Sequence, residues 1–199
     1  MHGRVGSVRF LWVFRARGGK VSGSVRFIAG GWRHVRRYGC MRYVMKQKVF
    51  SIGDKFAIRN ENEEDAFFVN GEVFSLGHKL SFEDAQGNEL LFIKQKLLSW
   101  GPTYELYRGD EHVATIKKEV FTLFRCTFNI HVDGQGDLEA QGDLSDHEYT
   151  MTRDGEPVAQ ISKQWFSWSD TYGVDIADDQ DPVLILASTV AIDMCCHEK

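Results

Sequence analysis

The chain has 199 residues, of which 43% are hydrophobic, and a net charge of −4, which suits one globular domain with a sizeable core. Nine of the 24 basic residues and none of the 28 acidic residues lie in residues 1–40, which leaves residues 41–199 with 15 basic and 28 acidic residues and a net charge of −13. We therefore expect no nucleic-acid binding by residues 41–199.

Residues 1–40 are rich in Arg and Gly and lack the continuous apolar run and cleavage site of a secretory signal. Their Arg excess and lack of acids are also features of an organellar transit peptide, and a basic arm can bind nucleic acid non-specifically. Because a coherent domain sequence begins at Met41, we interpret residues 1–40 as a disordered basic extension or a mis-set start, and residues 41–199 as the domain.

From Met41 onward, short runs of β-branched and aromatic residues alternate with turn residues. Asn60–Asp65 and Asp84–Asn88 are predicted turns, and Asn70-Gly71 between apolar runs predicts a tight hairpin. Turns at intervals of about 8–12 residues are typical of a β-sandwich or barrel. Strands are predicted beside these turns at Lys46–Ile52, Phe56–Arg59, Ala66–Val69, Val73–Leu76 and Lys79–Glu83.

The middle of the chain contains an internal repeat. Ile93–Tyr104 (IKQKLLSWGPTY) and Ile161–Tyr172 (ISKQWFSWSDTY) share Ile, Ser, Trp, Thr and Tyr at equivalent positions, and Ile116–Phe128 aligns with one inserted residue. Each copy is predicted to be a strand, a short bend and a second strand. Hairpins that must each bury one face are best closed into a barrel, which also removes exposed strand edges.

The C-terminal residues predict a helix over about 182–197 that is buried on every side. Asp181 is a suitable N-cap and Pro182 suits the first helical position. The apolar run is shorter than the roughly 20 residues that a membrane span needs. Polar residues interrupt it only at Ser188, Thr189 and Asp193. We therefore predict a helix inside the barrel, with core residues Val183, Leu184, Ile185, Leu186, Val190 and Ile192.

Several segments resemble a known family. They are MRYVMKQKVFSIGDKFAIRNE at residues 41–61, FIKQK at 92–96, ISKQWFSW at 161–168, DTYGVDI at 170–176 and the final apolar helix. Over residues 41–199 the chain resembles the LURP-one-related family, which belongs to the tubby C-terminal-like superfamily with the tubby proteins and phospholipid scramblases. The resemblance implies a closed antiparallel barrel of about twelve strands around a central C-terminal helix. It implies no catalytic residues, and no tubby phosphoinositide motif is matched.

The sequence contains no nucleophile elbow, phosphate-binding loop or dinucleotide fingerprint, so we predict no catalytic residues and no cofactor. The triplet Asp146-His147-Glu148 is interpreted as a solvated turn, because neighbouring strand residues point to opposite faces. The cysteines lack the spacing of a disulfide framework, which favours a reduced, cytoplasmic setting, and Cys195 and Cys196 are interpreted as buried thiols.

Acidic residues gather ahead of the helix. They could bind a hard cation through oxygen ligands, or form a solvated loop at the helix's positive end. We expect no metal site, and the weak candidates for one are Asp175, Asp178 and Asp179.

Lysines recur beside the isoleucines of the repeat, and tryptophans stand at its bends. If each isoleucine faces the interior, Lys94, Lys96 and Lys117 point outward. Outward lysines can bind an anionic headgroup or simply protect strand edges, and exposed tryptophans suit a membrane interface or a protein partner. The lipid- or anion-binding candidates are Lys94, Lys96, Lys117, Lys118, Lys163, Trp100 and Trp168.

Two functional hypotheses follow. The first is a non-enzymatic module that binds anionic phospholipid headgroups or an apolar ligand at a membrane surface. The second is a scaffold for a protein partner, with no lipid role. An enzyme ranks third, because a barrel filled by its own helix leaves no deep pocket. We expect a cytoplasmic monomer, peripheral at the membrane, with no transmembrane span.

Overall fold

The computed structural model describes residues 14–16, 19–21, 40–46, 55–72, 77–119, 126–143, 146–163 and 171–197. The chain divides into two units, Met1–Arg37 and Tyr38–Lys199. In the first unit, β1 (Phe14–Ala16) and β2 (Gly19–Val21) form a short antiparallel hairpin. The other residues of the predicted disordered extension, apart from Cys40, lie outside the described residues.

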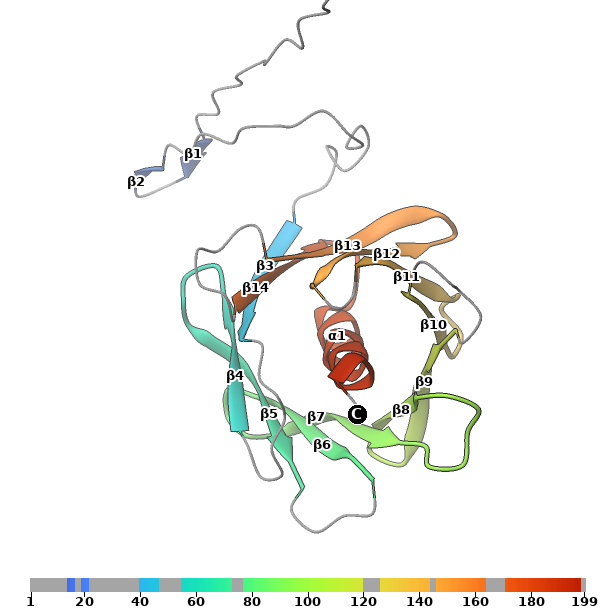
Figure 1. The fold of residues 1–199 in the computed structure, drawn as a ribbon. Helices are drawn as coiled ribbons and strands as arrows, with labels where there is room; N and C mark the ends of the chain where they lie inside the picture. Colours follow the sequence, from blue (N-terminus) through green and yellow to red (C-terminus); the bar gives the residue numbers. More distant parts are fainter. Residues whose placement is uncertain are drawn as a thin grey trace, which may run out of the picture. The chain divides into compact units, whose positions relative to one another are not determined.

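The second unit is a closed antiparallel barrel of twelve strands, which confirms the predicted tubby-like fold (Figure 1). Each strand pairs with the strands before and after it in the chain, and the first and last strands pair with each other to close the barrel. The strands are β3 (Cys40–Lys46), β4 (Lys55–Asn60), β5 (Asp65–Gly71), β6 (Lys79–Asp84), β7 (Glu89–Gln95), β8 (Thr103–Arg108), β9 (Glu111–Lys118), β10 (Cys126–Val132), β11 (Leu138–Asp143), β12 (Glu148–Arg153), β13 (Glu156–Ser162) and β14 (Thr171–Ala177).

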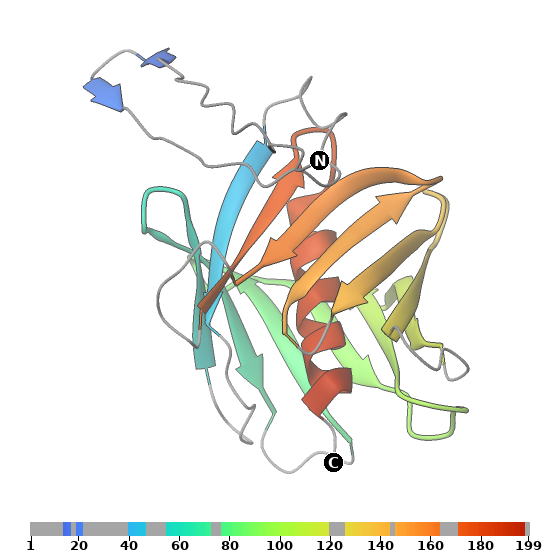
Figure 2. The ribbon, with the colours of Figure 1, turned by 45° about the horizontal axis from the view of Figure 1, so that its top comes forward.

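The helix α1 (Pro182–His197) runs through the middle of the barrel, with strands on all sides (Figures 1 and 2). Asp181 caps it, because its Oδ1 accepts hydrogen bonds from the backbone N–H groups of Val183 at 2.9 Å and Leu184 at 3.4 Å. No helix among the described residues is long and apolar enough to cross a membrane. Of the predicted core residues Val183 is partly buried, and the fully buried ones are Leu184, Ile185, Leu186, Val190 and Ile192.

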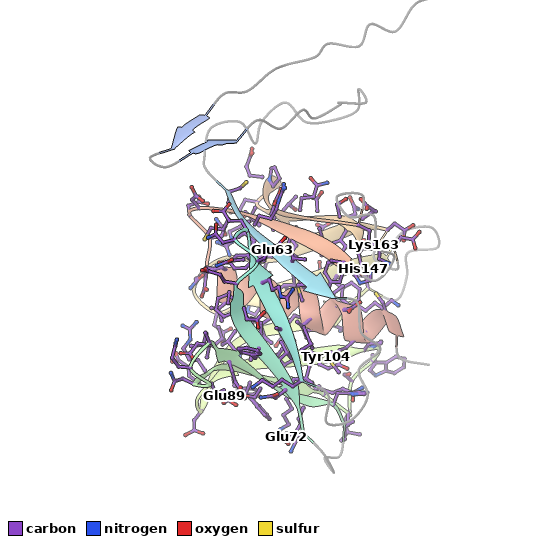
Figure 3. All side chains as sticks on the ribbon, turned by 90° about the vertical axis from the view of Figure 1, so that its left-hand side faces the viewer. Glu63, Glu72, Glu89, Tyr104, His147 and Lys163 are labelled. Atoms are coloured by element: carbon purple, nitrogen blue, oxygen red, sulfur yellow. The ribbon has the colours of Figure 1, made fainter. Side chains whose placement is uncertain are left out.

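The internal repeat places equivalent isoleucine side chains inside the barrel. Ile93 in β7, Ile116 in β9 and Ile161 in β13 have no exposed surface, so the equivalent isoleucine of every copy faces the interior, which is the condition on which the outward direction of the neighbouring lysines was predicted. Figure 3 shows how side chains from strands on both sides of α1, among them Tyr104, fill the space between the helix and the barrel wall. The core is therefore built from one face of each strand and the whole circumference of the helix.

Two predicted turns are confirmed, and the predicted hairpin is wrong. Asn60 and Asp84 each end a strand, and their side-chain oxygens accept backbone hydrogen bonds from the turns that follow. Asn70 and Gly71 instead lie inside β5, where Gly71 pairs with Leu80. The strand continues there because Asn70 is tied across to β6 by a 2.6 Å hydrogen bond from its Nδ2 to Glu83 Oε1.

Two predicted strands lie mostly or wholly outside the described residues and stay predictions. Residues 47–54, which include most of the predicted strand Lys46–Ile52, lie outside the described residues, and so do residues 73–76. Strand β3 occupies the segment just before the first of these and was not indicated by alternation.

Candidate functional site

The candidate lysines lie on different parts of the barrel. Lys94 on β7 and Lys117 on β9 are exposed, and only β8 lies between them, since Lys94 pairs with Glu105 and Lys117 with Thr103. Lys118 is partly buried. Lys163 follows β13, which is four strands from β9 in the order of the sheet. The structure therefore brings Lys94, Lys96 and Lys117 onto one outer surface and leaves Lys163 elsewhere.

The exposed apolar side chains of the described residues are concentrated in the connection between β7 and β8. In this segment, residues 96–102, the side chain of Leu98 is 96% exposed, that of Trp100 92% and that of Leu97 58%. These three are the exposed large hydrophobic residues among all those described. We call the segment the apolar loop. Trp100 was a sequence candidate, whereas Leu97 and Leu98 were missed, and Trp168 lies outside the described residues.

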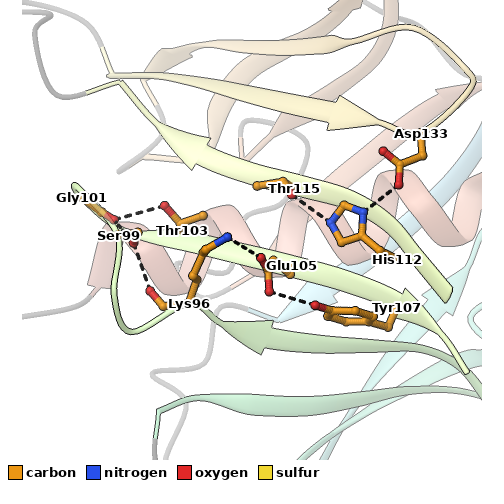
Figure 4. Close-up of polar contacts among 9 residues, drawn as sticks. All are labelled: Lys96, Ser99, Gly101, Thr103, Glu105, Tyr107, His112, Thr115 and Asp133. Carbon is orange, nitrogen blue, oxygen red and sulfur yellow. Dashed lines mark hydrogen bonds and ion pairs between the residues drawn. The ribbon is translucent and has the colours of Figure 1, made fainter. Parts of the chain in front are cut away.

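Hydrogen bonds hold the backbone of the apolar loop in place (Figure 4). The Ser99 hydroxyl lies 2.7 Å from the carbonyl oxygen of Gly101 and 3.0 Å from that of Lys96, and the Thr103 hydroxyl donates to Gly101 at 3.2 Å. The Lys96 N–H donates to the Thr103 carbonyl at 2.9 Å, which closes the base of the loop. The exposed side chains are thus presented by a backbone with internal hydrogen bonds.

The loop is also anchored to the connection between β5 and β6. Gln95 donates its backbone N–H to the His78 carbonyl at 2.8 Å and accepts a hydrogen bond from the His78 N–H on its Oε1 at 3.0 Å. Leu97 lies so close to Gly77 that a Cβ added there would stand 2.8 Å from Leu97 Cδ2. Leu97 therefore rests on the barrel, while Leu98 and Trp100 project from it.

A short polar network lies beside the loop on β8 (Figure 4). Lys96 Nζ is 2.8 Å from Glu105 Oε1, and the Tyr107 hydroxyl donates to Glu105 Oε2 at 2.9 Å. The hydrogen bond to Glu105 raises the pKa of Lys96, and the same bond lowers the pKa of the Glu105 carboxyl. Burial and the Glu105 hydrogen bond raise the pKa of the Tyr107 hydroxyl. Glu105 thus balances the charge of Lys96, and Lys94 and Lys117 supply the exposed positive charge.

The acidic residues ahead of α1 have structural partners. Arg42 donates two hydrogen bonds to the carboxylate of Asp175, at 2.6 and 2.7 Å, and so joins β3 to β14. Asp181 caps the helix and lies 3.3 Å from Arg108. In the part of the chain that the structure describes, Asp175, Asp178 and Asp179 form no group suited to a metal ion.

His147 is not in a solvated turn, so that interpretation of the triplet is wrong. Its side chain, labelled in Figure 3, is 1% exposed. Its Nε2 lies 2.6 Å from Oδ1 of Asp193 on α1, and the Asp193 side chain is 3% exposed. The ring also stacks on Tyr172, with centroids 4.2 Å apart. The side chains of adjacent residues point in different directions here, because the positive φ of His147, 54°, turns the chain toward the barrel interior. An acidic residue in a helix predicted to be buried was the available signal for such a partner.

Two buried tyrosines near Asp193 predict a loss of stability in alkali. Burial, followed by the charge of Asp193, raises the pKa values of Tyr149 and Tyr172 well above 10.0. The unfolded chain releases these protons near pH 10, whereas the folded barrel retains them, so this stabilisation is complete below pH 10 and is lost as pH rises further. Denaturant melts from pH 8 to 11 should show that fall, and Tyr149→Phe should make it shallower.

Tyrosinate absorbance provides the independent readout for that prediction. The chain has six tyrosines, and those buried in the barrel should ionise only when the protein unfolds. Ionisation of all six before the loss of the circular dichroism signal would contradict the prediction.

A family model described as LURP-one-related matches residues 41–193. The uncharacterised protein YxjI of Bacillus subtilis is 39% identical over 154 residues, which cover 77% of this chain and 92% of that protein. An X-ray structure of an Arabidopsis thaliana protein is similar in fold, with a TM-score of 0.57 at 17% identity over 77% of this chain and 88% of that one. The chain therefore belongs to the LURP-one-related family.

Proposed function

We propose that this protein is a non-enzymatic, cytoplasmic binding module that docks on anionic membrane surfaces through the apolar loop and the flanking lysines. The observation that carries the proposal is the exposure of Leu98 and Trp100 on a loop with its own internal hydrogen bonds. Exposed apolar side chains on a constrained backbone favour binding, because less conformational freedom is lost when they are buried.

The chemistry of the loop suits the boundary between headgroups and acyl chains. An indole has an apolar body with a polar N–H and is preferred at that depth, and leucine reaches the hydrocarbon beyond it. Full burial of one such side chain contributes about 1.5–3 kcal/mol, and each lysine near an anionic surface contributes about 1 kcal/mol. The apolar term is therefore the larger one, and Lys94 and Lys117 add the preference for anionic lipid.

The negative charge of the rest of the domain would orient the apolar loop and its flanking lysines toward an anionic membrane. Residues 41–199 carry a net charge of −13, so most of the barrel is repelled by an anionic membrane. Only a face with exposed lysines and apolar side chains can approach closely. The helix inside the barrel further supports a non-enzymatic module, because it occupies the space where a barrel protein would hold a substrate.

The apolar loop is too small to form a stable interface with a protein partner. Three exposed apolar side chains cover far less than the roughly 800 Å² per partner of a stable protein interface. The described residues show no second cluster of exposed large hydrophobic side chains that would extend the surface. The scaffold hypothesis therefore becomes an outcome of the experiment.

The test is co-sedimentation of the full chain with vesicles of phosphatidylcholine alone or mixed with phosphatidylserine, over a salt series. We expect binding to the mixed vesicles that weakens with salt. Leu98→Ser combined with Trp100→Ser should weaken it by about tenfold or more at every salt concentration, because at least one buried apolar side chain is lost.

Charge variants separate the electrostatic contribution. Lys94→Gln combined with Lys117→Gln should reduce binding to the mixed vesicles and make the salt dependence shallower. Lys55→Gln is the matched control, since Lys55 is exposed on β4, three strands away from β7. Absence of binding to both vesicle types, or binding unchanged in the Leu98 and Trp100 variant, would reject the proposal and favour a protein partner.

A further inference from the structure

Two histidines and two aspartates meet on the outer surface where β9 and β10 end. His112 lies on β9, His131 on β10, and Asp133 and Asp137 in the turn between β10 and β11. His112 Nδ1 is 2.7 Å from Asp133 Oδ2, and His131 Nε2 is 3.7 Å from Asp133 Oδ1 (Figure 4 shows the first contact). The carboxylate of Asp133 thus stands between two imidazoles, one near each oxygen. We call these four residues the His–Asp cluster.

In each imidazole, the ring nitrogen that does not contact Asp133 has a polar partner of its own. His131 Nδ1 is 2.7 Å from Asp137 Oδ1, and His112 Nε2 is 2.9 Å from the Thr115 hydroxyl. An ionised carboxylate only accepts hydrogen bonds, so Nδ1 of His131 carries the hydrogen, and in the neutral ring Nε2 keeps its lone pair. That lone pair lies on the side of Asp133. Two electron-rich atoms therefore face each other across 3.7 Å, an arrangement that a cation between them would stabilise.

His112 can present a lone pair to the same point. The Thr115 hydroxyl both donates and accepts, so it can accept a hydrogen bond from Nε2–H of His112. As the structure stands, the 2.7 Å contact makes Nδ1 of His112 the donor to Asp133, so a cation would replace that hydrogen and the ring would take the tautomer in which Nδ1 bears the lone pair. Thr115 and Asp137 thus occupy the places of the groups that orient metal-bound histidines by accepting their second ring N–H.

We propose that the His–Asp cluster binds one divalent transition-metal ion of the zinc type, through His112 Nδ1, His131 Nε2 and a carboxylate oxygen of Asp133. Ligands of tetrahedral zinc with bonds of 2.0–2.1 Å stand about 3.3 Å apart. The two contacts of Asp133, at 2.7 and 3.7 Å, lie on either side of this value. As they stand, no group of His, Cys, Asp or Glu among the described residues is arranged to hold a metal ion, so binding requires these exposed side chains to move closer together around the ion.

The donor set selects the class of metal. Two imidazoles with one carboxylate favour zinc, cobalt, nickel or copper over magnesium and calcium, which prefer oxygen ligands. Three protein ligands leave a fourth position for water, and the exposure of all four side chains, from 32% to 67%, allows the ion to enter directly. A bound ion would fasten the β10–β11 turn to β9. The site is separate from the apolar loop in its residues and its chemistry.

The test is calorimetric titration of the full chain with Zn²⁺, alongside optical titration with Co²⁺. We expect one ion per chain at this site, and His112→Ala, His131→Ala and Asp133→Asn should each weaken its binding by more than a hundredfold. Asp137→Asn should weaken it by about 10–100-fold, because the residue only orients His131. His78→Ala, at an exposed histidine in the β5–β6 connection, should have no effect.

Ring-nitrogen ¹⁵N shifts identify the ligands directly, which matters because the chain has seven histidines. Zn²⁺ should shift Nδ1 of His112 and Nε2 of His131, and leave their other ring nitrogens protonated. Circular dichroism checks that every variant folds. Absence of Zn²⁺ and Co²⁺ binding, or binding that is unchanged in His131→Ala, would overturn the proposal.

Discussion

Deletion of residues 182–199 is expected to abolish folding of the LURP-one-related domain. The barrel encloses α1, and five aliphatic side chains of the helix are fully buried against the inner faces of the strands. At about 1.5–3 kcal/mol each, they contribute roughly 7–15 kcal/mol together, as much as the whole stability of a typical domain. The inward side chains of the strands also lose their partners, including Ile93, Ile116 and Ile161.

Circular dichroism and thermal melting measure this effect. The truncated chain should show no cooperative melt, and a separate peptide of residues 181–199 should restore one when it is added. Deletion of residues 1–37, a larger change confined to the other unit, is the control and should leave the melt of the domain in place. A truncated chain that keeps its β signal and a cooperative transition would contradict the role given to α1.

Replacement of Asp193 or His147 by alanine is expected to destabilise the domain by about 3–5 kcal/mol, because each change removes the hydrogen bond between these two buried polar groups. The pair joins α1 to the turn before β12 at a distance of 2.6 Å, and both side chains are almost completely buried. Asp193→Asn should cost less, since an amide oxygen can still accept a hydrogen bond.

A double-mutant cycle in denaturant separates the pair from its surroundings. Asp193→Leu combined with His147→Leu should cost much less than the sum of the two single changes to leucine, because two apolar side chains in contact do not need a polar partner. Thr152→Ala, at a partly buried residue of β12, is a control for general effects on that strand. Single variants that lose less than about 1 kcal/mol would show that the pair contributes little to stability.

The fold was predictable because its signals are local in the sequence. Apolar residues on every side of residues 183–196 indicate a buried helix, and the repeated isoleucines indicate which face of each strand is inward. Asp181 and the turns at Asn60 and Asp84 follow from side chains that bond to nearby backbone groups. The prediction of a hairpin at Asn70-Gly71 was wrong, because a hydrogen bond to the cross-strand neighbour Glu83, thirteen residues away, keeps Asn70 within β5.

The candidate site was less predictable, because it depends on which residues the folded barrel leaves uncovered. Leu97 and Leu98 look like core residues in the sequence, yet they lie in a loop beyond the end of β7. His147 and Asp193 are 46 residues apart, and nothing between them indicates that they meet. Lys163 stands two residues after its repeat isoleucine, one position later than Lys94 and Lys117 in their repeats, and the barrel carries it to a different side.

The order of the elements also has a consequence for synthesis. Strands β3 and β14 close the barrel, and Arg42 bonds to Asp175 across a separation of 133 residues. At a translation rate of about 5–20 residues per second, the ribosome makes β3 roughly 7–30 s before the first turn of α1. During that interval the nascent strands have open edges and no helix to cover their apolar faces. Newly made chains of this family should therefore be strong clients of ribosome-associated chaperones, and slowing translation near the end of the message should increase their aggregation.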